Sequence, residues 1–362
     1  MRTTSNRAFT LTELLVVISI IVLLIAVALP AFNAMLYSSE SAMAEATLKG
    51  SVGAARDAAI RSGAGNDCAA VFLYEPGGRI SVVACERVGV LNDQDLGNGG
   101  TVRREVFVPL AGFEAATLPK NFTVRGYAPA GSVDKNWYEI SNGSGGLRYP
   151  LGQAAWVFPE TGFYDKTAAQ DAGRRQTFMV RFEGGTGLLK ASANQAALVV
   201  APRPSTTNRL VTAAWQRVDR ASDLRRWALR VLAEPGIPDA VRRQLIGDIS
   251  GDTALARPVS QLALCDERWL ARTLGVRVDK ATGCLYQSAD APRFVASANM
   301  TAARLSSALE GDVNFNGRID FPDDVSEAKL LVIDAYTGAM NPVAIPAVGQ
   351  GSNAAQQEGS VP

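Results

Sequence analysis

Hydrophobic residues are concentrated near the N-terminus of the chain. Residues 14–29 contain no charged side chain and a single hydroxyl group, that of Ser19. Together with the mostly apolar residues before it, this run reaches the roughly 20 residues that a helix needs to cross a bilayer. Arg2 and Arg7 precede the run, and positive charges on the short side of such a helix favour a cytoplasmic N-terminus. The pattern predicts one membrane-spanning helix, with the rest of the chain translocated.

The helical pattern continues beyond Pro30. Apolar positions at mixed spacings of three and four residues predict an amphipathic continuation of the same helix over residues 31–62. A secretory signal peptide is the alternative for the apolar run, but helix-like sequence follows Pro30 where such a peptide has its small-residue cleavage site. We therefore assign residues 9–30 to a transmembrane helix.

Residues 63–204 have a different pattern, in which short apolar and β-branched runs are separated by Gly, Pro and Asn. Such runs are typical of strands. We expect them to form an antiparallel sheet that packs on the second half of the long helix. The predicted strands are residues 69–74, 79–85, 104–109, 122–127, 155–158, 177–182 and 196–200.

The C-terminal half predicts further helices and a polar tail. Residues 205–310 include the helix-like segments 217–234 and 238–249 and are assigned to an inserted helical module. Residues 311–348 are assigned to a polar loop and terminal strands, and residues 349–362, rich in Gly, Ser, Ala and Gln, to a disordered tail. The expected fold class is α+β.

The charged residues narrow the range of functions. The chain of 362 residues has 36 Lys and Arg, 35 Asp and Glu, and no histidine. The lack of histidine excludes Ser-His-Asp and Cys-His nucleophiles and His-ligated zinc, and no other nucleophile–base pair stands out, so we expect no enzyme. Arginines are frequent between residues 217 and 243, but acidic residues lie among them. This mixture favours local ion pairs over a nucleic-acid surface, so no nucleic-acid partner is expected.

One charged residue lies within the apolar run. A carboxylate such as that of Glu13 is costly in a membrane and suggests a functional site. The segment Arg-Ala-Phe-Thr-Leu-Thr-Glu-Leu-Leu-Val-Val, residues 7–17, resembles the N-terminal signal of type IV prepilins and type II secretion pseudopilins. The resemblance implies that residues 1–8 are a leader peptide, cleaved between Ala8 and Phe9 by a prepilin peptidase, and that Phe9 is then N-methylated. It also implies assembly roles for Glu13 and for Pro30, the expected helix-kinking proline.

The chain departs from the family pattern at two positions of this signal. Ala8 replaces the usual glycine before the cleavage site, and Thr12 replaces a usual aliphatic residue. Alanine is small, so we still expect cleavage, at a reduced rate.

The resemblance implies a structural role. It suggests a pilin-like subunit that assembles with other pilins or pseudopilins, from the inner membrane into a type IV pilus or a type II secretion pseudopilus. The C-terminal domain would then be periplasmic or extracellular, and part of a surface fibre after assembly. The length of the chain favours a minor, tip or priming subunit over the repeating shaft. The alternative is a membrane-tethered, calcium-stabilised adhesin or binding module that uses the same signal.

The chain has four cysteines, which allow three disulfide connectivities. Cys68 and Cys85 lie on the two arms of a predicted hairpin, and Cys265 and Cys284 flank another short stretch. Because an extracytoplasmic location permits disulfides, we favour the pairs Cys68–Cys85 and Cys265–Cys284. Four reduced, buried thiols are the alternative.

Residues 311–324 have the spacing of a calcium-binding loop. They resemble an EF-hand, and more closely one half of a dockerin, although only one copy is present and Pro322 hinders a following helix. Gly317 occupies the sixth position of the loop, where a sharp turn is needed. An Asx-rich surface turn is the alternative. The predicted calcium ligands are Asp312, Asn314, Asn316, the carbonyl of Arg318, Asp320 and Asp323.

Overall fold

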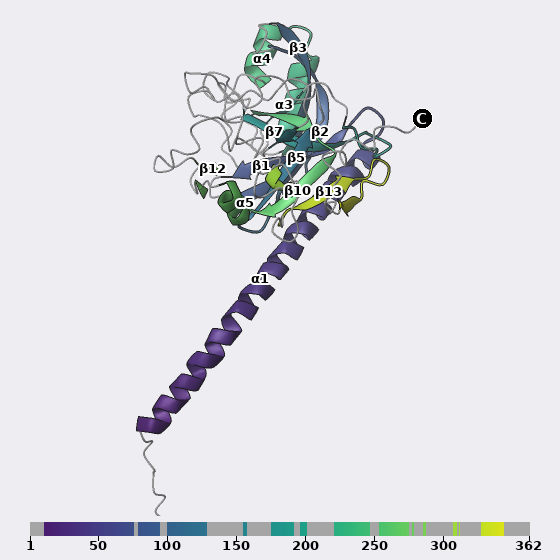
Figure 1. Cartoon of the computed structure of the whole chain (residues 1–362). Helices are drawn as coiled ribbons and strands as arrows, with labels where there is room; N and C mark the ends of the chain where they lie inside the picture. Colours follow the sequence, from purple (N-terminus) through teal and green to yellow (C-terminus); the bar gives the residue numbers. More distant parts are fainter. Residues whose placement is uncertain are drawn as a thin grey trace, which may run out of the picture. The chain divides into compact units, whose positions relative to one another are not determined.

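The structure is a computed structural model of the whole chain, and both helices and strands are present, as expected for an α+β protein (Figure 1). Contacts divide the chain into two units, residues 1–46 and 47–362, which are described separately. The structure describes residues 11–75, 79–94, 100–128, 155–157, 175–191, 196–200, 221–246, 253–274, 277–278, 285–286, 307–309, 311 and 327–343.

The N-terminal helix α1 extends over Leu11–Ser62, which confirms the predicted continuous helix among the described residues. Pro30 lies inside it, and the helix continues on both sides. In the second unit, the segment from residue 47 to Ser62 places one face against the sheets. Leu48, Val52, Ala55 and Ala59 are fully buried there, at the spacing of successive helical turns.

Six strands of the second unit form a closed barrel, in the order β1-β7-β9-β8-β3-β2, because β1 pairs with both β7 and β2. The short strand β4 extends the edge of β2. The pairs β3–β8 and β7–β9 are parallel, so the predicted purely antiparallel sheet is wrong. Parallel neighbours are joined by long connections, which a local sequence pattern does not reveal. The strands are β1 (Cys68–Glu75), β2 (Arg79–Gln94), β3 (Thr101–Pro109), β4 (Ala116–Thr117), β7 (Arg175–Phe182), β8 (Ala197–Val200) and β9 (Thr253–Pro258).

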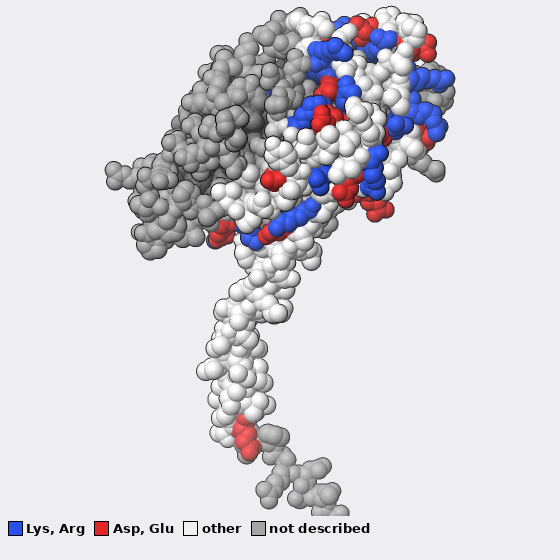
Figure 2. Space-filling view, turned by 90° about the vertical axis from the view of Figure 1, so that its right-hand side faces the viewer, with Lys and Arg blue, Asp and Glu red and all other residues white. Residues whose placement is uncertain are grey.

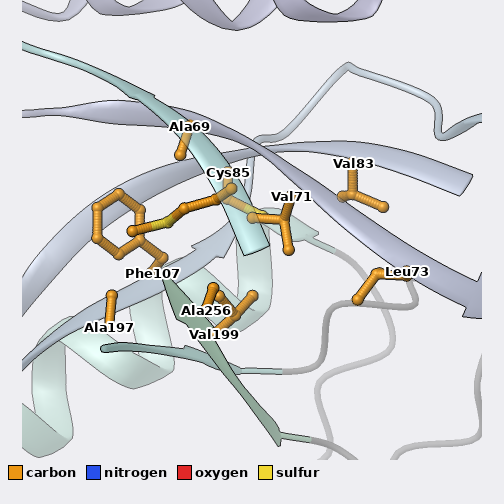
Figure 3. Packing of buried hydrophobic residues seen from close by; sticks show 10 residues of the cluster. Ala69, Val71, Leu73, Val83, Cys85, Phe107, Ala197, Val199 and Ala256 are labelled. Atoms are coloured by element: carbon orange, nitrogen blue, oxygen red, sulfur yellow. The ribbon is translucent and has the colours of Figure 1, made fainter. Parts of the chain in front are cut away.

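Alternate residues of these strands fill the barrel. On β1, Ala69, Val71 and Leu73 point inward, as expected from the two-residue period of a strand (Figure 3). All six strands contribute to this cluster, in which the ring of Phe107 lies among small side chains such as Ala197. A six-stranded barrel has a narrow interior, so these side chains are sufficient to fill it.

A second sheet has the order β14-β13-β10-β5-β6. It packs against the outer face of the barrel, where the ring of Phe178 lies beside Gly126 and stacks on Phe72 with 4.5 Å between ring centroids. A separate two-stranded sheet consists of β11 (Arg277–Val278) and β12 (Leu285–Tyr286). The strands of the second sheet are β5 (Phe122–Ala128), β6 (Ala155–Val157), β10 (Gln261–Asp266), β13 (Lys329–Ile333) and β14 (Met340–Val343).

Residues 205–310 are not a purely helical module. They do contain α3 (Ala221–Ala233) and α4 (Asp239–Ile246), as predicted, and also α5 (Glu267–Leu274). However, β9 and β10 also belong to this segment, and each lies inside one of the two main sheets. β9 was not predicted because its sequence, Thr-Ala-Leu-Ala-Arg-Pro, has one β-branched residue and ends in proline, whereas the equally buried β8 is rich in β-branched residues.

Replacing Gly126 with alanine tests the contact between barrel and second sheet. A Cβ atom at Gly126 would lie 2.7 Å from Phe178 ring atoms and 3.0 Å from Cγ1 of Val259. We expect the overpacking to reduce the free energy of unfolding by about 1–3 kcal/mol, measured by urea unfolding of the detergent-solubilised full chain. Gly236→Ala is the control, since no atom lies within 4 Å of its Cβ position. Equal stability of the two variants would contradict the packing described here.

Candidate functional site

The first unit consists of the exposed N-terminal part of α1. Its large apolar side chains from Leu11 to Leu29 are exposed, and among the described residues α1 is the one helix long and apolar enough to cross a membrane. The hydroxyl of Ser19 donates to the carbonyl of Leu15 (2.8 Å) and is therefore satisfied within the helix. This surface suits a lipid or protein environment better than water.

Glu13 is the one residue among Asp, Glu, Lys and Arg between Leu11 and Ser39, and it lies in the first turn of α1. Figure 2 shows this part of the helix as uncharged except for an acidic spot at its N-terminal end. A carboxylate in the first turn is favoured by the helix dipole. The predicted processing residues Ala8 and Phe9 lie outside the described residues.

The same segment matches a known family model, described as a prokaryotic N-terminal methylation motif, over residues 3–29. The chain carries a prepilin-type N-terminal methylation motif. The motif supports a pilin-like or pseudopilin-like precursor and implies processing by a prepilin peptidase. With α1, it fits a single-pass membrane anchor. Comparisons of the chain with curated proteins and with solved structures found no match.

Beyond the methylation motif, the most concentrated group of charges lies at one end of the barrel interior. Arg181 of β7 lies opposite Ala69 of β1 and, like Ala69, points into the barrel. The guanidinium of Arg181 lies 5.3 Å from the ring centroid of Phe107. Its Nε donates to Oδ2 of Asp67 at 2.9 Å, and its Nη1 forms an ion pair with Glu105. Because the Arg181 side chain is only 1% exposed, this cation depends on the protein for its solvation.

The two carboxylates have further partners. The N–H of Gly184 and Nζ of Lys190 each lie 3.1 Å from an oxygen of Asp67, and Nε of Arg87 lies 2.8 Å from Glu105. Burial raises the pKa of Asp67, but the hydrogen bonds from Gly184 and Arg181 outweigh it and hold the pKa below its ordinary value. The pKa of Glu105 is likewise lowered, since the bond and charge of Arg181 outweigh burial.

In this barrel-end network, Asp67, Arg87, Glu105, Arg181 and Lys190, each carboxylate contacts two cations. The lowered pKa values make both carboxylates weak bases near neutral pH, and their oxygens are held by cations. The sequence analysis missed the network because its members are far apart in the chain and none lies in a recognisable motif.

Among the described cysteines, the predicted pair Cys68–Cys85 is not formed. Cys85 is opposite Ala69 in the β1–β2 ladder and points into the barrel, whereas Cys68 is adjacent to Ala69 and points to the other face. Successive side chains of a strand alternate between faces, so Cys68 and Cys85 cannot bond. Cys265 is also a free, buried thiol, and Cys284 lies outside the described residues.

We expect Cys68 and Cys85 to react slowly with a maleimide in the folded protein and rapidly in urea. Burial raises the pKa of Cys68 to about 11 and also raises that of Cys85, so little reactive thiolate is present near neutral pH. Mass spectrometry of labelled peptides measures both rates. Recovery of a peptide in which Cys68 and Cys85 are disulfide-bonded, from protein purified without reductant, would contradict the barrel register.

The other predicted ligands and surfaces have mixed outcomes. The predicted calcium ligands, Asp312 to Asp323, lie outside the described residues, whereas the terminal strands expected within residues 311–348 are present as β13 and β14. Among the described residues, no group of three or more acidic or cysteine side chains could hold a metal.

Basic and acidic residues alternate on the described surface of the second unit (Figure 2). Local ion pairs are present as predicted at Arg226–Asp223 (3.5 Å) and Arg242–Asp239 (3.0 Å). Arg225 instead pairs with Glu86 of the distant strand β2 (2.9 Å).

Proposed function

We propose that this protein is a structural subunit of a type IV pilus or of a type II secretion pseudopilus, in a minor, tip or priming role. The methylation motif at the start of α1 is the observation that carries the proposal. The chain would enter the inner membrane through α1, with its C-terminal domain on the outer side. No catalysis by the chain is required, since the peptidase and the methyltransferase act on it.

The charges of the N-terminus suggest how a subunit would join a fibre. Cleavage between Ala8 and Phe9 creates a positive amine at Phe9, close to Glu13 in the sequence. In a fibre core of low dielectric constant, that amine can neutralise the carboxylate of Glu13 on a neighbouring subunit. Such pairing would set the axial position of each added subunit.

The size of the folded domain supports a minor, tip or priming role. The second unit combines a closed barrel, a second sheet and the helices α3, α4 and α5. A repeating shaft would have to accommodate this bulk at every subunit, whereas a tip or priming position has fewer neighbours.

The test is to express the full chain with and without a prepilin peptidase and its assembly machinery. We expect a mature N-terminal peptide that begins at N-methylated Phe9 only when the peptidase is present, and we expect the mature chain in sheared surface fibres. Ala8→Gly should be cleaved at least as fast, and Ala8→Arg should block cleavage. A cleaved chain that stays entirely in the membrane fraction would instead support the tethered adhesin or binding module.

We further propose that residues 311–324 bind calcium, on the basis of the loop spacing of Asp312, Asn314, Asn316, Arg318, Asp320 and Asp323. The loop shortly precedes β13, which pairs with both β10 and β14, so a bound ion would fix the entry into the second sheet.

Chelation with EDTA is expected to lower the melting temperature of the full chain by about 5–10 °C, if calcium was present well above its dissociation constant. Restoring calcium should reverse the change, and magnesium should not. The double variant Asp312→Ala, Asp323→Ala should no longer respond to EDTA. An unchanged melting curve of the unmodified protein in EDTA would rule the site out.

A further inference from the structure

The second-unit part of α1 is held by two turns that come from different sheets. One turn, residues 183–189, follows β7 of the barrel, and the other, residues 334–339, joins β13 to β14 of the second sheet. The guanidinium of Arg56 binds both, since Nε donates to the carbonyl of Gly187 (3.3 Å) and Nη2 to the carbonyl of Tyr336 (3.1 Å). We call Arg56 and these two turns the Arg56 junction.

Backbone hydrogen bonds reinforce the junction. The N–H of Gly185 donates to the carbonyl of Ala59 on α1, and the N–H of Leu189 donates to the carbonyl of Ala335 in the other turn, each at 2.9 Å. The helix and the two turns therefore form a closed set of contacts in which each member is bonded to the other two.

The second of these turns is held in shape by its own hydrogen bonds. The carboxylate of Asp334 accepts the N–H of Tyr336 at 3.0 Å, the N–H of Thr337 at 2.6 Å and the Thr337 hydroxyl at 2.8 Å. The carbonyl that binds Arg56 thus belongs to a preorganised turn, and little ordering of the chain is needed to form the junction.

Glycines allow the close approach of both turns. A Cβ atom at Gly187 would lie 2.6 Å from Cγ1 of Ile60, and one at Gly338 would overlap Cδ of Arg56. Both glycines also have positive φ angles, +69° and +66°, which other residues rarely adopt. Two turns that are far apart in the sequence thus meet the same two helical turns of α1.

The covalent chain connects α1 directly only to β1, through residues 63–67. We propose that the Arg56 junction divides a pulling force on α1 between the barrel and the second sheet. Without the junction, tension would pass along the covalent chain into β1 and through the apolar packing of α1, with no polar contact among the described residues between α1 and the turn of the second sheet. The inference rests on the proposed function, because a fibre subunit is held through α1 and its exposed domain is pulled.

Arg56→Leu and Arg61→Leu form a matched pair for the test. Both arginines are on α1, but within the described part of the chain the hydrogen bond of Arg61 is a local one, from its Nε to the carbonyl of Asp57 in the same helix (3.1 Å). Arg56→Lys is a third variant, which keeps the charge but lacks the planar fork that can bind two carbonyls at once. If Arg56→Leu fails to fold, Arg56→Lys is compared with Arg61→Leu in its place.

Two measurements on the purified full chain in detergent test the junction. We expect Arg56→Leu to speed amide hydrogen exchange about tenfold or more in both turns, 183–189 and 334–339, because two charge-assisted bonds are lost. In single-molecule pulling through tags at the two ends of the chain, the same variant should unfold at a lower force. Arg61→Leu should match the wild type in both, and Arg56→Lys should be intermediate.

Exchange rates and unfolding forces of Arg56→Leu that equal those of Arg61→Leu would overturn the proposal. Faster exchange in one turn only, with an unchanged unfolding force, would overturn it as well. Neither measurement needs assembly, so a failed junction is distinguishable from a failed pilin assignment, which the sheared-fibre experiment tests separately.

Discussion

Arg181→Met is expected to reduce the free energy of unfolding by about 3–5 kcal/mol at neutral pH. The change removes the cation that binds Asp67 and Glu105 together at the barrel end and leaves a nearly buried carboxylate, Asp67, with weaker neutralisation. Lys190, which is 44% exposed on its side chain, still contacts Asp67 but is screened by water. Urea unfolding followed by tryptophan fluorescence measures the effect.

A surface arginine provides the control for this variant. The side chain of Arg226 is 82% exposed and lies 3.5 Å from Asp223, so Arg226→Met should change the unfolding free energy by about 0–1 kcal/mol. If the two variants have the same stability, the barrel-end network is not the stabilising feature that its burial indicates.

The pH dependence of stability, compared between the wild type and Arg181→Met, gives a second test of the barrel-end network. In the wild type, the lowered pKa values of Asp67 and Glu105 mean that the network stabilises the protein above the ordinary carboxyl pKa of about 4 and loses this effect as the pH falls below it. In Arg181→Met, burial is less well opposed and should raise the pKa of Asp67. Protonation then relieves the unpaired charge, so the stability difference between the two proteins should shrink from pH 7 to pH 4.

Glu13→Ala is expected to reduce incorporation into sheared fibres at least about tenfold, while membrane insertion and cleavage continue. The expected loss follows from the low-dielectric fibre core, where the Phe9 amine of a neighbouring subunit would lose its counter-charge. The ratio of mature chain in fibres to mature chain in membranes measures it, with quantitative mass spectrometry.

Thr12→Ala is the matched control for Glu13→Ala, since it changes the neighbouring residue without altering charge and should leave incorporation unchanged. Glu13→Gln keeps the size of the side chain and should behave like Glu13→Ala if charge is what matters. Normal incorporation of the Glu13→Ala protein would contradict the pairing mechanism.

Several elements could be predicted because their signals are local. The seven strands predicted between residues 63 and 204 coincide with described strands, and α1 has the predicted continuous course. The strand boundaries agree within three residues except at the end of β2, which was predicted at residue 85 and lies at Gln94. Strand runs and amphipathic helices are visible in short windows, since burial of one face imposes a period of 2 or 3.6 residues. β9 escaped detection because its alanines, arginine and terminal proline are weak strand signals, although it is as buried as the predicted strand β8.

The candidate site also has a part that could be predicted from the sequence and a part that could not. The methylation motif could be read from residues 7–17, because a peptidase reads a short linear segment and a carboxylate in an apolar run is conspicuous. The prediction of a Cys68–Cys85 pair was wrong because a hairpin indicates only that two strands are adjacent. The register that places Cys85 opposite Ala69 decides which face each thiol occupies.

The sequence by itself determined the apolar helix, its charged ends and the methylation motif. A membrane is a uniform environment and a peptidase reads a short linear segment, so both kinds of signal are contained in a short stretch of sequence. Only the tertiary structure decided the barrel closure, the burial of Arg181 with Asp67 and Glu105, and the meeting of two turns at Arg56. These features join residues more than 30 positions apart, and for Arg56 and Tyr336 the separation is 280. Such contacts depend on the packing of the whole domain, which a period in a short window does not encode.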